Sequence, residues 1–375
     1  MAKSFEDRSC AGESQAAPRA GNETAHAPAG VAFAELAQRF ERQVRFAPLG
    51  RVGQGNLVSA RVLVVGCGAL GGILAQTLFR AGVGELVLVD RDVVELSNLP
   101  RQVLFDERHA REGTPKALAA KDTLEQSGGP SVVRAHVLNL DARNLELVAD
   151  DVDLVLDGTD NLETRYLLND FCIARGLPWV YAGVVGSSGL VLPILPGRSA
   201  CLACVFPEPP PAGVLPTCET AGVLLPAVGA VASFAAGLGL RLIARPDVPF
   251  EPALIELDTW NGDVRRLSAP RDPDCRVCGR REFVFLHRPG AEAISLCGRN
   301  TVQIPTRGAP HVLGTLARSL PPAASEVRLH EGLLRFAFEG CRVSVFPDGR
   351  ALVEGTSDVA RARSLHARAL GRVAE

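Results

Sequence analysis

The sequence has almost no net charge, because 40 Lys and Arg residues are balanced by 42 Asp and Glu residues, leaving −2 at pH 7. Nucleic acids and anionic membranes are usually bound by an excess of basic residues. The composition therefore gives no reason to expect a nucleic-acid or membrane partner. The N-terminus also lacks the apolar core of a secretory signal, since it includes Glu6 and Asp7. We expect a cytoplasmic protein.

The chain has room for one large domain and a smaller one, with 375 residues of which 47% are hydrophobic. One run, residues 221–240, has no charged side chain over 20 positions, the length of a membrane span. It contains Pro226 and four glycines, and small residues outnumber Leu and Ile. These features argue against a span. We predict a buried helix whose glycines and alanines allow close packing.

Residues 1–30 are rich in Ala, Gly, Pro, Ser and charge without periodicity, which predicts a disordered tail. From residue 31 to 281, helix-like and strand-like runs alternate. The predicted strands are residues 61–65, 85–89, 132–138, 153–157, 179–182 and 189–192. The predicted helices are residues 32–43, the segment from a glycine-rich loop to residue 80, 116–126 and 162–175. This alternation is typical of an α/β fold, a Rossmann-like, doubly wound and mostly parallel sheet.

The pattern changes near residue 282, and we predict a separate small α+β domain over residues 282–375. Its predicted elements are a strand near Ile294, a helix at 312–319, strands at 326–329, 333–338, 342–346 and 351–353, and a final helix at 358–370. The last two strands are expected to pair around the turn formed by Pro347, Asp348 and Gly349.

A glycine-rich loop follows the first predicted strand and contains Gly66, Gly68, Ala69 and Gly71. Its backbone N–H groups at a helix N-terminus offer a seat for phosphate. Its glycines permit close backbone approach. Asp90 ends the second predicted strand and is placed to accept hydrogen bonds from a ribose. These features alone also fit an NAD-dependent dehydrogenase, or an Asp that merely caps a loop.

Polar residues after the second predicted strand argue against a dinucleotide as the ligand. They are Asn98, Arg101, Gln102 and Lys116, and Asp92 lies in the same stretch. Each cation alone is typical of a solvated surface. Two cations near a nucleotide, however, suit a charged triphosphate better than a hydride carrier. The sequence therefore favours ATP over NAD.

Asp160 and Asn161 follow the predicted strand at residues 153–157. In a parallel sheet this strand end lies at the same edge as Gly66 and Asp90, so one pocket can collect them. Asp160 is a candidate Mg²⁺ ligand, since Mg²⁺ usually takes one or two carboxylates plus phosphate oxygens. Its alternative role is to cap the helix that follows.

The chain has ten cysteines, and four form two Cys-x-x-Cys pairs: Cys201 with Cys204, and Cys275 with Cys278. Four thiolates in this pattern predict tetrahedral Zn²⁺. With no open ligand position the zinc should be structural, and it would tie a long excursion of the chain back to the sheet. Free thiols are the alternative, and a disulfide framework is not expected in a reducing cytoplasm.

Cys218 precedes the uncharged run of small residues. A cysteine at a helix N-terminus has a lowered thiol pKa and is a candidate nucleophile. The alternative is a buried structural thiol.

Together these motifs resemble those of the ThiF/MoeB/HesA family, bacterial adenylyltransferases related to ubiquitin-activating E1 enzymes. The resemblance runs from about Arg39 to Gly279 and opens with Arg-Phe-Glu-Arg-Gln at residues 39–43, where Phe replaces the family's Tyr. The remaining motifs follow in order: the glycine loop, Asp90, Ser-Asn-Leu-x-Arg-Gln, Pro-Lys, Asp-x-Thr-Asp-Asn, Thr-Cys-x-x-Ala-Gly-Val and both cysteine pairs.

The resemblance implies roles for particular residues. Those matching the family's ATP contacts are Gly68 and its glycine neighbours, Asp90, Asn98, Arg101 and Lys116. Asp160 and Asn161 match the family's Mg-ATP site. Arg42 matches an arginine that reaches across a homodimer into the partner's ATP site. Cys218 matches a cysteine that links covalently to a sulfur carrier in some members and is dispensable in others.

The implied reaction is adenylation of the C-terminal glycine carboxylate of a small ubiquitin-like sulfur carrier. It yields an acyl-adenylate and pyrophosphate, and a sulfur donor such as a cysteine desulfurase would act next. The C-terminal residues resemble the tail of longer ThiF-type proteins of thiamine thiazole synthesis and lack a rhodanese active-site loop. We therefore favour a ThiS-type carrier, with the MoaD-type carrier of molybdopterin synthesis as the alternative.

Three other interpretations stay open. An NAD-dependent dehydrogenase explains the glycine loop and Asp90 but leaves Arg101, Lys116 and the cysteine pairs unexplained. A non-catalytic zinc scaffold that docks a small partner would not require the ATP residues. An E1-like enzyme could adenylate a different carboxylate, such as one on a modified tRNA base, although the lack of a basic patch argues against it.

Overall fold

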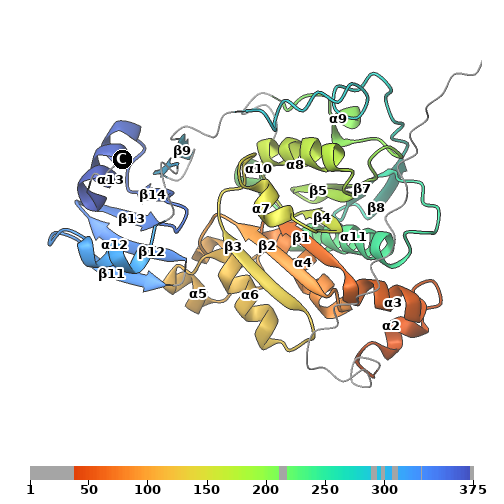
Figure 1. The fold of residues 1–375 in the computed structure, drawn as a ribbon, viewed down its shortest axis with the longest axis horizontal. Coiled ribbons are helices and arrows are strands. Elements are labelled where there is room, and N and C mark those ends of the chain that lie inside the picture. The colour runs from red at the N-terminus through yellow and green to blue at the C-terminus, as the bar shows by residue number, and fades with distance from the viewer. Residues whose placement is uncertain are drawn as a thin grey trace, which may run out of the picture.

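The computed structural model describes residues 38–210, 218–288, 294–296, 300–305, 311–330 and 332–371. Figure 1 shows two β-sheets, a large one with helices on both faces and a smaller one built from the C-terminal part of the chain. The predicted tail at residues 1–30 lies outside the described residues, as does the first half of the predicted helix at 32–43. The end of that prediction overlaps α2 (Glu41–Arg45), which leads into α3 (Gly50–Ser59).

The large sheet has eight strands in the order β3-β2-β1-β4-β5-β6-β7-β8. Their bounds are β1 (Arg61–Val65), β2 (Glu85–Asp90), β3 (Val132–Val137), β4 (Leu154–Asp157), β5 (Trp179–Val185), β6 (Ser188–Ile194), β7 (Leu254–Asp258) and β8 (Asp263–Leu267). The strands from β3 to β5 run parallel and those from β6 to β8 are antiparallel additions. The mostly parallel α/β prediction is confirmed. Because the strand order reverses between β1 and β4, their carboxyl ends form the expected ligand crevice.

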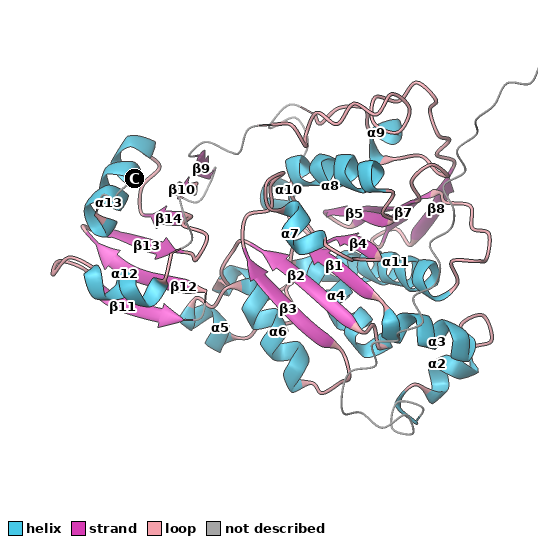
Figure 2. Ribbon diagram, viewed as in Figure 1, coloured by secondary structure: helices cyan, strands magenta, loops and turns pink. Residues whose placement is uncertain are grey.

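Helices cover both faces of this sheet (Figure 2). The first face carries α4 (Ala69–Ala81), α6 (Lys116–Gln126) and α11 (Leu225–Ala244), and the second carries α7 (Leu145–Ala149), α8 (Leu162–Arg175) and α9 (Leu202–Val205). In β1, Val62 and Val64 pack with the first set, while Leu63 and Val65 pack with the second. The strand is apolar on both sides because both sides are buried.

The uncharged run forms α11, which begins at Leu225 with Pro226 in its first turn, where a missing N–H costs nothing. Its inner face packs closely, since a Cβ on Gly239 would lie 3.0 Å from a methyl of Leu154. Its outer face is open, with Phe234 41% exposed. The prediction of a buried helix therefore holds for one face only. By length and composition α11 is the described helix that could cross a membrane, with 44% of its most apolar window buried, and core helices pass the same test.

The small sheet is antiparallel throughout, in the order β11-β12-β13-β14-β10-β9. Its elements are β9 (Ile294–Leu296), β10 (Thr301–Ile304), α12 (Leu313–Ser319), β11 (Ser325–His330), β12 (Leu333–Phe338), β13 (Cys341–Val345), β14 (Ala351–Glu354) and α13 (Val359–Leu370). The predicted pairing around the turn at residues 347–349 is present. The strand β10, which lies between β14 and β9, was not predicted. We call the part from β9 to α13 the C-terminal module, and its boundary at residue 282 stays a prediction.

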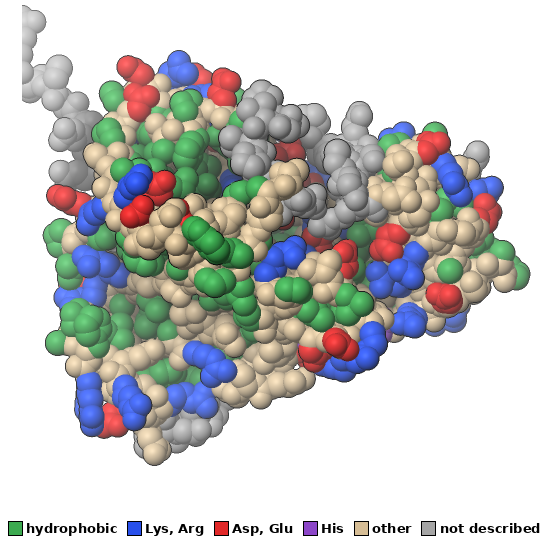
Figure 3. Space-filling view, turned by 180° about the vertical axis from the view of Figure 1, so that it is seen from behind, with side chains coloured by type: hydrophobic (Ala, Val, Ile, Leu, Met, Phe, Trp, Pro, Cys, Tyr) green, Lys and Arg blue, Asp and Glu red, His purple; other side chains and the backbone are tan. Residues whose placement is uncertain are grey.

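The rear face of the molecule carries Lys and Arg side chains interspersed with Asp and Glu (Figure 3). This mixing agrees with the near-zero net charge of the chain.

Candidate functional site

The glycine loop brings three backbone segments into close contact at the carboxyl ends of β1 and β4. A Cβ on Gly71 would lie 1.7 Å from the carbonyl oxygen of Gly66, and one on Gly158 would lie 2.6 Å from Cα of Gly71. Gly66 also has φ +85° and donates its N–H to the Val89 carbonyl at 2.7 Å. Only glycine fits these positions. The first turn of α4 therefore begins in the crevice, with unpaired N–H groups available for an anion.

Asp90 connects β2 to this loop. Its Oδ2 accepts the N–H of Cys67 at 2.7 Å, and its Oδ1 accepts the N–H of Asp92 at 2.7 Å. The second bond is the local loop cap considered from the sequence, whereas the first spans 23 residues. Burial raises the pKa of Asp90, while Lys116 acts in the opposite direction. Asp90 is thus held rigidly beside the glycine loop.

Lys116 begins α6 and is buried, with only 6% of the residue exposed. Its Nζ lies 3.3 Å from Oδ2 of Asp92. Burial alone would lower the pKa of Lys116, but Asp92, Asp90 and Asp160 raise it above the usual lysine value. The side chain therefore stays cationic and lies between the acidic residues that follow β2 and β4.

The remaining residues of the predicted polar group have mixed surroundings. Asn98 is buried, and its Oδ1 accepts the N–H of Glu95 in a capping box. Gln102 is buried against Gly68, where an added Cβ would lie 3.6 Å from its Nε2, and its Oε1 has no partner among the described residues. Arg101 donates Nη1 to the Ser97 carbonyl at 2.8 Å. An unpartnered amide oxygen next to the glycine loop is a feature that a bound ligand would satisfy.

Arg165 is a residue of this region that the sequence reasoning missed. Its Nε donates to Oδ2 of Asp157 at 3.0 Å, and its Nη2 donates to the carbonyls of Thr159 and Ala182 at 2.5 and 3.1 Å. Burial raises the pKa of Asp157, and Arg165 opposes that shift. The ion pair fixes the loop that follows β4. The available signal was an arginine in the first turn of a helix, an unfavourable position that requires an acidic partner.

In the loop after β4, Asp160 and Asn161 have different surroundings. Oδ1 of Asn161 accepts the N–H groups of Glu163 and Thr164 at 2.8 and 3.4 Å, so Asn161 caps α8. The alternative in which Asp160 caps this helix is therefore wrong. Asp160 is exposed, and its charge acts on Lys116.

The four cysteines of the two Cys-x-x-Cys pairs come together, as predicted. Cys201 Sγ lies 3.9 Å from Cys204 and 3.6 Å from Cys275, Cys204 lies 3.4 Å from Cys278, and all four sulfurs lie within 4.8 Å of one another. A tetrahedron with metal–sulfur bonds of about 2.3 Å has edges of about 3.8 Å. Disulfides would need about 2.05 Å. The cluster can hold a metal ion.

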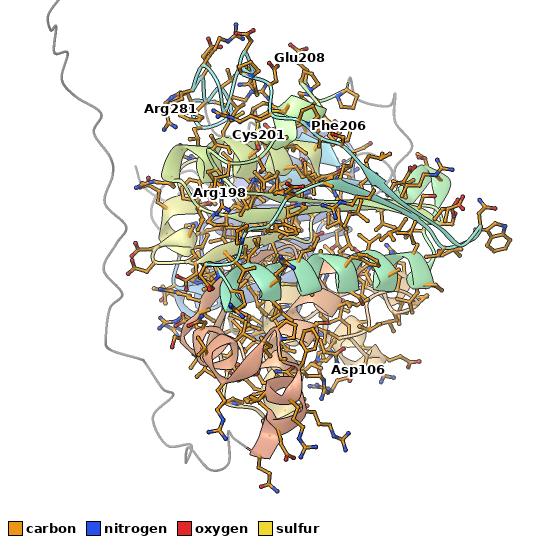
Figure 4. All side chains as sticks on the ribbon, turned by 90° about the vertical axis from the view of Figure 1, so that its right-hand side faces the viewer. Asp106, Arg198, Cys201, Phe206, Glu208 and Arg281 are labelled. Atoms are coloured by element: carbon orange, nitrogen blue, oxygen red, sulfur yellow. The ribbon has the colours of Figure 1, made fainter. Side chains whose placement is uncertain are left out.

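The cluster lies on the face of the sheet that carries α8, opposite α11, and Cys201 is labelled there in Figure 4. Asn169 on α8 receives the N–H of Leu202 at 2.9 Å and donates Nδ2 toward Cys201 Sγ at 3.8 Å. The N–H of Asp272 points to Cys204 Sγ at 3.5 Å. The two chain segments carrying the cysteines are therefore anchored on the second face of the sheet, away from the crevice.

Two predicted residues are not brought to the crevice by any described contact. Arg42 is exposed on α2. Cys218 begins α10 (Cys218–Ala221), a four-residue helix separate from α11, and its side chain lies outside the description. Cys218 precedes the long helix, as expected, but the helix that it begins is α10, which Gly222, with φ +73°, ends before α11 begins.

The sheet order, the glycine loop at its switch point and the cysteine cluster define a Rossmann-like protein with an added cluster of four cysteines that could hold a metal ion. The chain belongs to the ThiF family, whose match covers residues 40–277. It is 38% identical over 338 residues to the sulfur carrier protein ThiS adenylyltransferase of Bacillus subtilis (strain 168), covering 89% of this chain and 99% of that one. That alignment is too long to be confined to residues 40–277, so it extends into the C-terminal module.

Two further comparisons agree. The sulfur carrier protein adenylyltransferase of Thermus thermophilus is 38% identical over 261 residues, covering 67% of this chain and 95% of that one. A crystal structure of E. coli MccB with MccA-N7isoASN superimposes with a TM-score of 0.57 at 24% identity, covering 64% of this chain and 75% of that one. The last likeness concerns the fold alone. The family prediction is confirmed, and an ATP-using adenylyltransferase family is favoured over an NAD-dependent dehydrogenase.

Proposed function

We propose that this protein uses ATP to adenylate the C-terminal glycine carboxylate of a small ubiquitin-like sulfur carrier. The observation that carries the proposal is the buried, charged Lys116 beside Asp90 and Asp92 at the switch point of the sheet. It occurs in a chain that aligns along almost the entire length of a ThiS adenylyltransferase. A buried lysine at the start of a helix near a glycine loop suits a triphosphate, which needs fixed positive charge.

The crevice offers each part of ATP a partner. The N-terminus of α4 and the backbone around Gly68 would hold phosphate oxygens. Asp90 would accept a ribose hydroxyl, because a carboxylate that already accepts two N–H groups retains further lone pairs. Gln102, whose Oε1 has no described partner, would contact the nucleotide beside Gly68. Asn98 would support this segment through its capping box.

The charged residues would act on the phosphates. Lys116 and Arg101 would neutralise negative charge as it shifts to the leaving pyrophosphate. Arg101 is free to turn from the Ser97 carbonyl toward a ligand, because its guanidinium pairs with no described carboxylate. Exposed Asp160 would hold Mg²⁺, with Asn161 fixing the loop as the α8 cap. When bound, Mg²⁺ would supply two further positive charges to the phosphates.

The reaction needs positioning more than proton transfer. A carboxylate oxygen of the carrier's terminal glycine forms a bond to the α-phosphorus. The bond from that phosphorus to the bridging oxygen breaks, and its electron pair leaves with pyrophosphate. A carboxylate is already ionised at neutral pH, so no general base is required. Holding both reactants in line supplies most of the rate.

Two predicted residues would act outside the adenylation step of their own subunit: Arg42 in the site of the partner subunit, and Cys218 in a later step. Arg42 would serve the ATP site of the partner in a homodimer, which agrees with its exposure on α2. Cys218 would form the covalent link to the carrier, if one forms, with a cysteine desulfurase as the class of sulfur donor. The cysteine cluster would hold structural Zn²⁺, because four thiolates leave no open position. We place the protein in the cytoplasm.

The favoured carrier is of the ThiS type, because the alignment with the Bacillus subtilis ThiS adenylyltransferase extends into the C-terminal module. The MoaD-type carrier of molybdopterin synthesis is the alternative. ATP–pyrophosphate exchange with purified protein, Mg²⁺ and each carrier in turn tests the proposal. Exchange with the ThiS-type carrier, lost when its terminal glycine is deleted, is the expected result. Exchange with the MoaD-type carrier alone would reverse the preference, and ATP binding with exchange for neither would overturn the substrate.

A further inference from the structure

The C-terminal module rests on the edge of the large sheet where β2 and β3 end (Figure 1). Val93, just past β2, forms a small apolar cluster with Leu333, Phe346 and Leu352 of the module, and Val137 at the end of β3 packs against it. Residues of the module thereby contact the segment that leads from Asp90 to α6.

Two arginines add polar contacts on the side of α5 (Glu107–Glu112). Arg328 donates Nη1 to the Arg111 carbonyl at 3.1 Å. Arg335 lies so close to Gly113 that a Cβ there would be 1.8 Å from its Nη1. The docked surface is therefore specific in shape and is not a loose contact between two separate bodies.

Arg350 is a module residue that hydrogen-bonds the backbone just after β2. It is buried, with 2% of the residue exposed, and its guanidinium stacks 3.7 Å from the centre of the Phe346 ring. Nη2 donates to the carbonyl of Arg91 at 2.7 Å, Nε lies 3.8 Å from Asp348 Oδ2, and Nη1 has no described partner. Burial lowers the pKa of Arg350 to about 10, and Asp348 and Asp92 counteract that shift. The cation is kept at a considerable desolvation cost.

The carbonyl that accepts the Arg350 hydrogen bond belongs to Arg91, the middle residue of the tripeptide Asp90-Arg91-Asp92. On one side of Arg91, Asp90 holds the glycine loop, and on the other Asp92 pairs with Lys116. The Arg91 side chain is itself tied to Asn139, after β3, by a 3.1 Å hydrogen bond. All three residues of the tripeptide are therefore fixed. Contacts within the large domain hold Asp90 and Asp92, and Arg350 of the module holds the backbone of Arg91.

We propose that Arg350 is a positioning residue for ATP: it fixes the backbone between Asp90 and Asp92, so that module docking and ATP binding stabilise each other. The inference rests on the proposed function, because it concerns the nucleotide of that same site. Coupling of this kind is reciprocal. If the docked module improves ATP binding by a given factor, bound ATP strengthens docking by the same factor.

Steady-state pyrophosphate exchange with full-length Arg350→Met tests the first half of the proposal, that the docked module improves ATP binding. Loss of a charge-assisted hydrogen bond is expected to raise the KM for ATP roughly tenfold. The kcat should change much less, because Lys116 remains in place. Arg350→Lys, which keeps the charge and one donor, should recover part of the loss. A lowered melting temperature with an unchanged KM would reduce Arg350 to a structural residue and overturn the proposal.

Two arginine variants provide matched controls. Arg342→Met removes an exposed cation of the module that pairs with Glu354 at 3.4 Å, and it should leave the KM for ATP unchanged. Arg328→Met removes a docking hydrogen bond that does not involve the tripeptide, and its KM should change less than that of Arg350→Met. Equal increases in KM for Arg328→Met and Arg350→Met would contradict a specific role for Arg350.

Hydrogen exchange on the wild-type protein and on Arg350→Met tests the second half of the proposal, that bound ATP strengthens docking of the module. Adding Mg²⁺ with a non-hydrolysable ATP analogue should slow amide exchange in β12 and in β13–β14, and this slowing should vanish in Arg350→Met. Protection confined to the large domain would overturn the coupling while leaving the proposed function intact. Failure of wild-type protein to bind ATP or catalyse exchange would overturn the proposed function, and the inference with it.

Discussion

Arg165 forms a buried ion pair with Asp157, with Nε and Oδ2 separated by 3.0 Å beneath the loop that carries Asp160. Asp157 is fully buried, and its other oxygen accepts both the N–H and the hydroxyl of Thr159. The pair connects the end of β4, the first turn of α8 and the Ala182 carbonyl in β5. The rigidity of the loop after β4 therefore depends on one arginine.

Arg165→Met should strongly destabilise the protein, because it leaves the Asp157 carboxylate buried without its cation. Removal of one member of a buried pair typically costs about 3–5 kcal/mol. Denaturant unfolding measures the change. Arg175→Met in the same helix breaks an exposed pair with Glu146 and a 5.9 Å cation–π contact with Phe171, and should cost about 1 kcal/mol. Similar losses in both variants would refute the importance of the buried pair.

Lys116→Ala should reduce carrier-dependent pyrophosphate exchange by about 10² to 10³-fold, the usual effect of removing one preorganised group that stabilises transition-state charge. Lys121→Ala is the control, because Lys121 is partly exposed on the same helix and pairs only weakly with Glu125 at 3.9 Å. Exchange rates and ATP affinity are measured for both. Near-normal exchange in Lys116→Ala would remove this lysine from the site.

Arg101→Ala should also reduce exchange severely while leaving unfolding almost unchanged, since Arg101 makes one described hydrogen bond, to the Ser97 carbonyl. Side chains with few native contacts contribute little to stability. Full activity of this variant would show that the phosphates are held by Lys116 and backbone N–H groups alone.

Cys275→Ser should lower both zinc content and thermal stability, because three thiolates cannot complete the tetrahedron. Metal analysis and calorimetry on purified protein give the two values. Cys341→Ser, at a buried cysteine of the C-terminal module, should retain the metal and serves as the control. One zinc per chain retained in Cys275→Ser would disprove ligation by all four cysteines.

Asp170 predicts a pH dependence of stability. Burial raises the pKa of Asp170 to about 6 from an ordinary 3.8, opposed by its hydrogen bond from the N–H of Phe285. The folded protein thus binds more protons than the unfolded chain between these values, so wild-type stability should fall as pH rises from about 4 to 6. Asp170→Asn should lack this component. Urea titrations across that range compare them, and parallel curves would contradict the raised pKa.

Elements with strong periodicity were predictable from the sequence. The bounds of α6, α8 and β12 match their predictions, and the glycine loop, Asp90 and Lys116 do meet at one sheet edge. These successes follow from parallel-sheet topology, which places strand ends together before any side chain is considered.

The features that the sequence did not predict depend on contacts between distant segments. The edge strand β8 is exposed along its entire length, so its sequence Asp-Val-Arg-Arg-Leu has no apolar alternation to detect. The strand β10 has only four residues, two of them the polar Thr301 and Gln303. Arg165 was missed because its partner, Asp157, is adjacent only after α8 folds back on β4. Tertiary contacts, and not local preference, created each of these features.

The cysteine cluster joins residues 201–204 to residues 275–278, and α11 and the β7–β8 hairpin lie between them. A bound metal would therefore close a long covalent loop, whose ends would otherwise separate freely in the unfolded chain. Antiparallel β7 and β8 extend the sheet at its outer edge, where fraying begins. Metal release would thus free the β7–β8 edge to open, while α11, whose inner face packs on β4, and the parallel strands that form the crevice stay in place.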